Sequence, residues 1–258
     1  MSAPTLTAPP ARRGISADRI AVPFWNGILS ALGAMVIGII GMFVALIVIM
    51  VAFMLATGHM PSTNPGHPLV ASAEVIVYIV GGAFAGWRLR AIGRNPFRRL
   101  TGTDGRVLLI GVGALILVHV GTAVQLYYTG QTKHVQTGLE HFTVVSKVPA
   151  VTTLSIALVV IATVALAPIV EEMIFRALLF GALAPRMGVL AGALLTAILF
   201  GATHGDLVLF PTLAALGFIA ALAYAATGNL WVSIALHALN NALGAAVLVA
   251  GSLHHTSR

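Results

Sequence analysis

No lysine, arginine, aspartate or glutamate occurs between Ile20 and Ala73. One helical span of a bilayer core needs only about 20 apolar residues, so this run exceeds what a single span requires. The whole chain is 59% hydrophobic and 8% charged, whereas about a quarter of the residues of a soluble domain are charged. We therefore predict an all-α, polytopic transmembrane helical bundle, because the alternating pattern of a transmembrane β-barrel is missing.

The net charge of +7 has its origin mainly in arginines that lie beside hydrophobic segments. In that position they favour contact with membrane lipids, and no nucleic-acid partner is expected. The chain has no cysteine, which excludes disulfides, thiol catalysis and cysteine-ligated metal sites.

Seven hydrophobic segments follow one another, and each is predicted to span the membrane. A break at Pro168 in the fourth segment would give eight spans. Residues 1–23 are expected to form a disordered basic tail and residues 251–258 a short tail. The predicted spans lie within Phe24–Ala56, Leu69–Trp87, Val107–Leu126, Ala150–Ala184, Val189–Thr203, Val208–Ala226 and Leu230–Ala250.

Arginines gather between Arg88 and Arg106, in the loop after the second span. With this loop and the N-terminus inside, ten basic residues are cytoplasmic and three lie outside, leaving out Arg176. That distribution satisfies the positive-inside rule. The apolar run after Arg19 is too long for a cleavable signal, so the first span is expected to be retained. We predict a multi-pass protein of a bacterial plasma membrane with a cytoplasmic N-terminus.

Two of the seven acidic residues, Glu171 and Glu172, stand beside Arg176 inside the fourth hydrophobic segment. Charges at membrane depth are costly and usually functional, although a structural ion pair is the other interpretation. Glu172 and Arg176 are four residues apart and share a helix face, whereas Glu171 points about 140° away from Arg176. We therefore expect Glu172 to pair with Arg176 and Glu171 to be left for chemistry.

A histidine on the next helix reaches the level of Glu171. Glu171 lies 16 residues before Met187 and His204 lies 17 residues after it. An antiparallel hairpin would hold the two at one depth, where they could position a water. On the seventh helix, His237 shares a face with Asn241, and Asn240 is almost as close; such side chains can donate hydrogen bonds to a developing oxyanion.

Two polar side chains in earlier spans, Glu74 and His119, are expected to have structural roles. Glu74 lies near the outer end of the second span and is expected at the membrane interface rather than in a catalytic site. His119, alone in the third span, is expected to donate a helix-packing hydrogen bond.

Taken in order, Glu171-Glu172-x-x-x-Arg176, Phe200-x-x-x-His204 and His237-x-x-x-Asn241 resemble the pattern of the CAAX-protease and bacteriocin-processing (CPBP) intramembrane proteases. The resemblance covers residues 150–250 and implies that they form the catalytic helical core. Residues 24–149 would then form N-terminal transmembrane helices and the cytoplasmic basic loop. The resemblance also implies hydrolysis of a peptide bond in a membrane-associated peptide or protein. By it, Glu171 and His204 would activate water and His237 with Asn241 would form the oxyanion hole. The supporting residues would be Glu172, Arg176 and Phe200.

We expect no obligatory metal or other cofactor. The alternative is a zinc ion held by Glu171, His204 and His237. Members of the family it resembles are often labelled metalloproteases for this reason. A His-Glu-x-x-His helix is missing, so such a site would need one ligand from each of three helices.

Two other functions remain open on the sequence alone. One is a noncatalytic immunity or scaffold protein of the same fold. The other is a proton-coupled transporter that uses Glu171 and His204 as a relay, although no matched pair of broken helices indicates a translocation path.

Overall fold

The computed structural model describes residues 16–60, 68–132 and 149–256. These residues form helices and turns with no strand, which confirms the all-α fold class. The predicted tail 1–23 falls largely outside the described residues, and its last part holds a short 3-10 turn, η1 (Ala17–Arg19). The helices are α1 (Phe24–Thr57), α2 (Pro68–Ala91), α3 (Gly102–Tyr128), α5 (Pro149–Val160), η2 (Ile161–Leu166), α6 (Ala167–Glu172), η3 (Met173–Phe180), α7 (Gly181–Met187), α8 (Val189–Thr203), α9 (Phe210–Thr227) and α10 (Leu230–Thr256).

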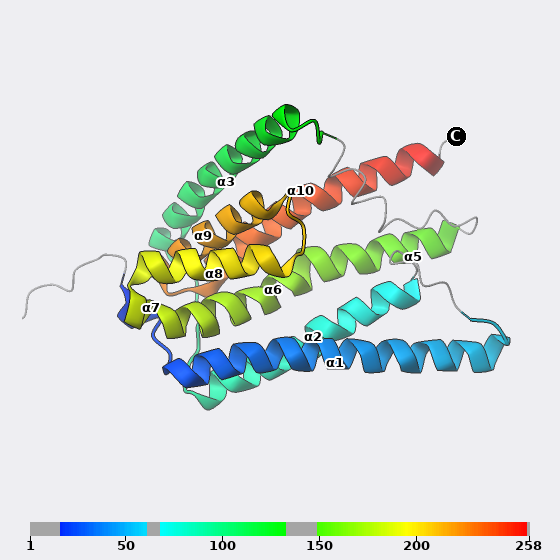
Figure 1. The fold of residues 1–258 in the computed structure, drawn as a ribbon, viewed down its shortest axis with the longest axis horizontal. Helices are drawn as coiled ribbons and strands as arrows, with labels where there is room; N and C mark the ends of the chain where they lie inside the picture. Colours follow the sequence, from blue (N-terminus) through cyan, green and yellow to red (C-terminus); the bar gives the residue numbers. More distant parts are fainter. Residues whose placement is uncertain (1–15, 61–67, 133–148, 257–258) are drawn as a thin grey trace, which may run out of the picture.

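The helices run back and forth along the long axis of the molecule (Figure 1). α1 and α2 pack against each other on one side of the bundle, and α3 packs against α9 and α10 on the other. The helix from α5 to α7 lies between these two groups and contacts α2, α8 and α10 through its successive segments. This central helix carries the Glu-Glu-x-x-x-Arg motif, so the motif lies in the middle of the bundle.

The central helix continues through Pro168 without interruption. Two of its segments, η2 and η3, are π-helical, and η2 ends two residues before Pro168. Proline lacks an N–H and its ring crowds the preceding helical turn, and a wider π turn relieves both problems. Because Thr153–Met187 remains one candidate span, the alternative of an eighth span created by a break at Pro168 is wrong.

Five helices in the described residues are long and apolar enough to cross a membrane: Phe24–Thr57, Pro68–Ala91, Gly102–Tyr128, Thr153–Met187 and Phe210–Thr227. The other two predicted spans are apolar but shorter helical stretches, Val189–Thr203 and Leu230–Ala246. Large apolar side chains of α1, such as Leu29 and Ile40, are more than half exposed, as expected for a face that contacts lipid.

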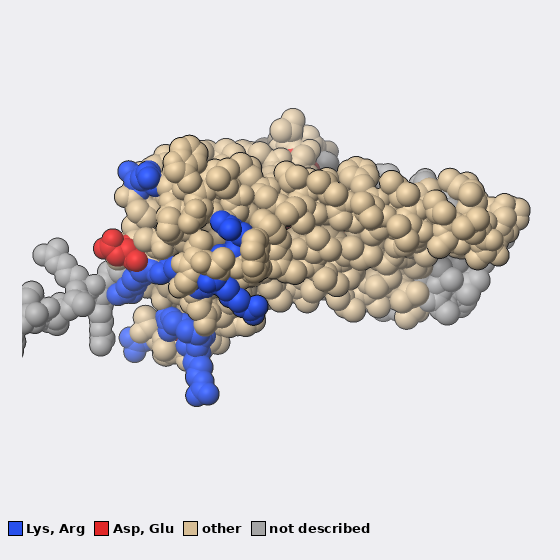
Figure 2. Space-filling model, turned by 90° about the horizontal axis from the view of Figure 1, so that it is seen from below, with Lys and Arg blue, Asp and Glu red and all other residues tan. Residues whose placement is uncertain are grey.

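Arginines gather at the end of the molecule where α1 begins and α2 ends (Figure 2). One of them closes the bundle there: Arg98 forms an ion pair with the buried Asp104 at 2.9 Å and donates to the carbonyl oxygen of Thr227. Asn229 donates to the other carboxylate oxygen of Asp104. The arginine-rich loop and the α9–α10 turn are therefore held together at one end of the bundle.

Close packing sets the position of α2 against α6. A Cβ atom added to Gly82 would stand 2.7 Å from Cγ2 of Val170, so no larger residue fits without a shift. Gly82 and Gly86 are four residues apart, a spacing typical of small-residue helix packing, but Gly86 has open space around it. Of these two glycines, Gly82 is the one at a close helix contact, and it lies one helical turn from Tyr78.

Candidate active site

The three polar side chains at the centre of the bundle form one buried network. Glu172 is fully buried, and its Oε1 lies 3.0 Å from Nδ1 of His237. Its Oε2 lies 3.1 Å from Nε of Arg176, which is 1% exposed. This second contact is an ion pair without hydrogen-bond geometry, since neither atom has a hydrogen-bond partner. The pairing of Glu172 with Arg176 confirms the prediction from their four-residue spacing.

Arg176 is held on its other sides by aromatic rings and a carbonyl. Its Nη2 donates to the carbonyl oxygen of Gly217 at 3.2 Å, and its guanidinium lies 4.5 Å from the ring centre of Phe200. Phe200 also contacts the rings of His204 and His237 edge-on, at 4.8 and 5.4 Å between centroids. Phe200 therefore links the buried arginine to both histidines of the predicted site.

Glu171 points away from Arg176, as the helix geometry predicted. The hydroxyl of Tyr78 donates to Oε1 of Glu171 at 3.4 Å, and Nε2 of His237 lies 3.8 Å from Oε2. Oε2 is buried and has no hydrogen-bond partner. Glu171 itself lines a cavity, and one of its oxygens has no donor in this arrangement.

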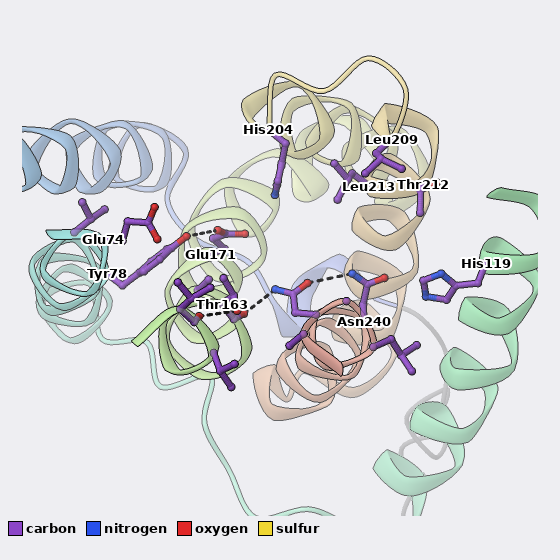
Figure 3. A pocket seen from close by; sticks show the side chains of 18 of the residues that line it. Glu74, Tyr78, His119, Thr163, Glu171, His204, Leu209, Thr212, Leu213 and Asn240 are labelled. Atoms are coloured by element: carbon purple, nitrogen blue, oxygen red, sulfur yellow. Dashed lines mark hydrogen bonds between the residues drawn. The ribbon is translucent and has the colours of Figure 1, made fainter. Parts of the chain in front are cut away.

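His204 ends α8 and reaches the same cavity from its opposite side (Figure 3). Its Nδ1 lies 2.8 Å from the carbonyl oxygen of Phe200. A carbonyl only accepts, so Nδ1 carries the proton and, in the neutral ring, Nε2 keeps its lone pair. Gly205, at φ +66°, then turns the chain, and Asp206 accepts hydrogen bonds from the amides of Val208 and Leu209.

His237 is 2% exposed and lies behind the two glutamates. Because its Nδ1 faces the carboxylate of Glu172, this nitrogen carries a proton, and Nε2 faces Glu171. Nε2 can donate to an oxyanion only when the ring carries both protons.

Asn240 and Asn241 both line the cavity and bond to each other, Asn240 Nδ2 donating to Asn241 Oδ1 at 3.1 Å. Asn241 Nδ2 also donates to the carbonyl oxygen of Thr163 at 2.8 Å. One proton of Asn241 is therefore engaged and one remains, so both asparagines stay candidates for an oxyanion donor.

The cavity lined by Glu171, His204, Asn240 and Asn241 has a volume of about 700 Å³ and mainly apolar walls, and His237 is not among its lining residues. Figure 3 shows Glu171, His204 and Asn240 directed at the same space. The predicted hairpin thus brings Glu171 and His204 to one cavity. A carboxylate, an imidazole and amide donors around one cavity are the groups that a hydrolytic water needs. Its walls come from α1, α2, α3, the central helix, α9, α10 and the turn after α8.

Several of these wall residues were missed or misplaced by sequence reasoning. Tyr78 was not considered, although it lies four residues after Glu74 and so shares its helix face. Glu74, which was expected at the membrane interface, also lines the cavity. His119 also lines the cavity, and its buried Nε2 has no hydrogen-bond partner, so the predicted packing hydrogen bond from this atom is wrong.

The alternative zinc ligands are only partly brought together. His237, with Nδ1 on the Glu172 carboxylate and Nε2 beside Glu171, has the arrangement usual for a metal-ligating histidine. Within residues 16–60, 68–132 and 149–256, however, no three His, Asp or Glu side chains lie close enough to hold one ion. His204 therefore does not complete a three-ligand site in this arrangement.

Residues 153–243 match the family model of the Rce1-like type II CAAX prenyl endopeptidases, which confirms the predicted family for this part of the chain. A stretch of 87 residues is 36% identical to "Putative membrane peptidase YdiL" of Bacillus subtilis (strain 168). That match covers 34% of this chain and 36% of the relative, so the chain spans about a third of its length. No solved structure shows a significant match.

Proposed function

We propose that this chain is an intramembrane endopeptidase that hydrolyses a peptide bond of a membrane-associated peptide or protein. The observation that carries this proposal is the convergence of Glu171 and His204 on one apolar cavity, which both side chains line. The family match over residues 153–243 and the name of the peptidase relative support the same class of reaction. The protein lies in the membrane through its apolar spans, with the arginine-rich end in the cytoplasm.

In the proposed reaction, Glu171 accepts a proton from a water held against Nε2 of His204. The resulting hydroxide attacks the scissile carbonyl carbon, whose oxygen becomes an oxyanion. Asn241, and His237 when doubly protonated, donate hydrogen bonds to that oxyanion. The proton taken up by Glu171 then passes to the leaving nitrogen, directly or through His204, as the C–N bond breaks.

Glu172, Arg176 and Phe200 support this site by fixing the positions of its side chains. Glu172 fixes the ring of His237 through Nδ1, and Arg176 balances the charge of Glu172. Phe200 packs against both histidines. Preorganised polar groups of this kind need no rearrangement when charge develops, and this is where much of enzymatic rate enhancement arises.

Cleavage by purified protein tests the proposal. Membrane-anchored peptides would be incubated with the wild type, Glu171→Gln and His204→Ala, and products would be identified by mass spectrometry. We expect both variants to lose cleavage, by about 100-fold or more, while keeping the helical circular dichroism of the wild type. Wild-type turnover by Glu171→Gln would refute the role given to Glu171.

A noncatalytic scaffold and a proton-coupled transporter predict different results. A scaffold protein would cleave no peptide in this assay. A transporter would instead move protons across a liposome membrane in a manner that depends on Glu171 and His204.

A further inference from the structure

The residue that contacts Glu171 from outside the central helix and α10 is Tyr78 on α2. α2 lies outside the matched residues 153–243, so the family match says nothing about this contact. Tyr78 lines the same cavity as Glu171 and His204, and Figure 3 shows its ring reaching from α2 to the Glu171 carboxylate. The hydroxyl is therefore part of the site wall.

Tyr78 has one hydroxyl proton and two carboxylates within its surroundings. Glu74 lies one helical turn earlier on the same face of α2, and Figure 3 shows it beside Tyr78. The proton nevertheless goes to Glu171, at 3.4 Å, and Glu74 has no hydrogen bond or ion pair within the described part of the chain. Tyr78 therefore bonds to Glu171 across a helix–helix interface and not to Glu74 on its own helix.

The packing between α2 and α6 fixes this selection. Gly82 lies against Val170, the residue before Glu171, at a distance that leaves no room for a Cβ atom. Tyr78 is one turn from Gly82, so the same close approach brings its hydroxyl to the level of Glu171. The register of the two helices is thus set one turn away from the hydroxyl–carboxylate contact.

We propose that Tyr78 is a positioning residue for Glu171. By holding Oε1, the hydroxyl fixes the orientation of the carboxylate that takes the proton from water. The proposal rests on the proposed peptidase function, because it assigns a role within that reaction. Hydrogen bonds of this kind are often long in a free enzyme and shorten in the complex with substrate.

Tyr78→Phe tests the positioning role because it removes the hydroxyl and keeps the ring. We expect kcat to fall about 10- to 100-fold, the range for losing a hydrogen bond to a charged group, with KM within about twofold. The matched control is Thr122→Val. It removes another cavity-lining hydroxyl, one that bonds to Thr212 at 2.6 Å, and we expect its kcat to stay near that of the wild type. An unchanged kcat for Tyr78→Phe, or an equal loss for both variants, would overturn the proposal.

A second measurement does not depend on cleavage. Dicyclohexylcarbodiimide is an apolar reagent that modifies carboxyl groups at membrane depth, and mass spectrometry of digested protein gives the rate at each glutamate. We expect Tyr78→Phe to raise the modification rate at Glu171 several-fold relative to Thr122→Val. Equal rates at Glu171 in both variants would show that the hydroxyl does not hold this carboxylate. If the wild type cleaves nothing, the peptidase proposal fails, and the labelling still decides whether Tyr78 controls Glu171.

Discussion

Removing Arg176 should expose how strongly the buried network depends on charge balance. Glu172 is fully buried, and its two partners are Arg176 at 3.1 Å and His237 at 3.0 Å. Arg176→Met keeps most of the apolar volume but leaves Glu172 without its cation. Removing one partner of a buried pair costs about 3–5 kcal/mol, so we expect a loss of this size in the free energy of unfolding.

The two partners should not be equivalent. Glu172→Gln leaves Arg176 with the carbonyl oxygen of Gly217 and the face of Phe200, and a desolvated cation–π contact contributes about 2 kcal/mol. We therefore expect Glu172→Gln to be less destabilising than Arg176→Met. The double variant leaves no uncompensated charge, and it should be more stable than Arg176→Met alone.

Unfolding of the purified protein by sodium dodecyl sulfate in mixed micelles, followed by tryptophan fluorescence, would give these free energies. Arg186→Met is the matched control, since Arg186 is an exposed arginine that stacks on Phe24 at 4.0 Å. Its loss should stay below about 1 kcal/mol. If the double variant loses the sum of the two single variants, the side chains are not coupled and the argument from charge balance is wrong.

The remaining predictions concern orientation, metal and the oxyanion donors. A cysteine placed at Arg98 in this cysteine-free chain should resist an impermeant thiol reagent in intact cells and react in opened cells; labelling in intact cells would reverse the orientation. Cleavage should survive exhaustive chelation, whereas activity that is lost on chelation and restored by stoichiometric zinc would establish a metal enzyme. Asn241→Ala should lower kcat by about 100-fold if its free amide proton binds the oxyanion, and Asn240→Ala should do so instead if that residue is the donor.

Local helix geometry was enough to predict the part of the site that lies on single helices or on one hairpin. The four-residue spacing predicted that Glu172 pairs with Arg176. The rotation per residue in a helix predicted that Glu171 points away from Arg176. Counting residues on either side of Met187 brought Glu171 and His204 to one cavity. These results depend only on rise and rotation per residue, which are nearly the same in every helix.

Contacts between distant helices could not be obtained in this way. Tyr78 reaches Glu171 because Gly82 packs tightly on Val170, and the spacing of residues along α2 does not show which helix its glycines meet. The position of Glu74 along its own helix likewise could not show that this side chain lines the cavity. The alternative of a break at Pro168 was wrong because a π-helical segment accommodates the proline, and no residue pattern predicted that segment.

The short α8 has a consequence for the lipid around the protein. Its 15 residues span about 22 Å, less than the roughly 30 Å of a bilayer's hydrocarbon layer. If α8 starts at the arginine-rich end, the polar turn with Gly205 and Asp206 stops short of the opposite surface. The adjoining leaflet must then sink toward that turn, an elastic deformation that grows with acyl-chain length. Bilayer thickness would in this way set how easily water meets His204, so short-chain lipids should favour turnover and long-chain lipids should slow it.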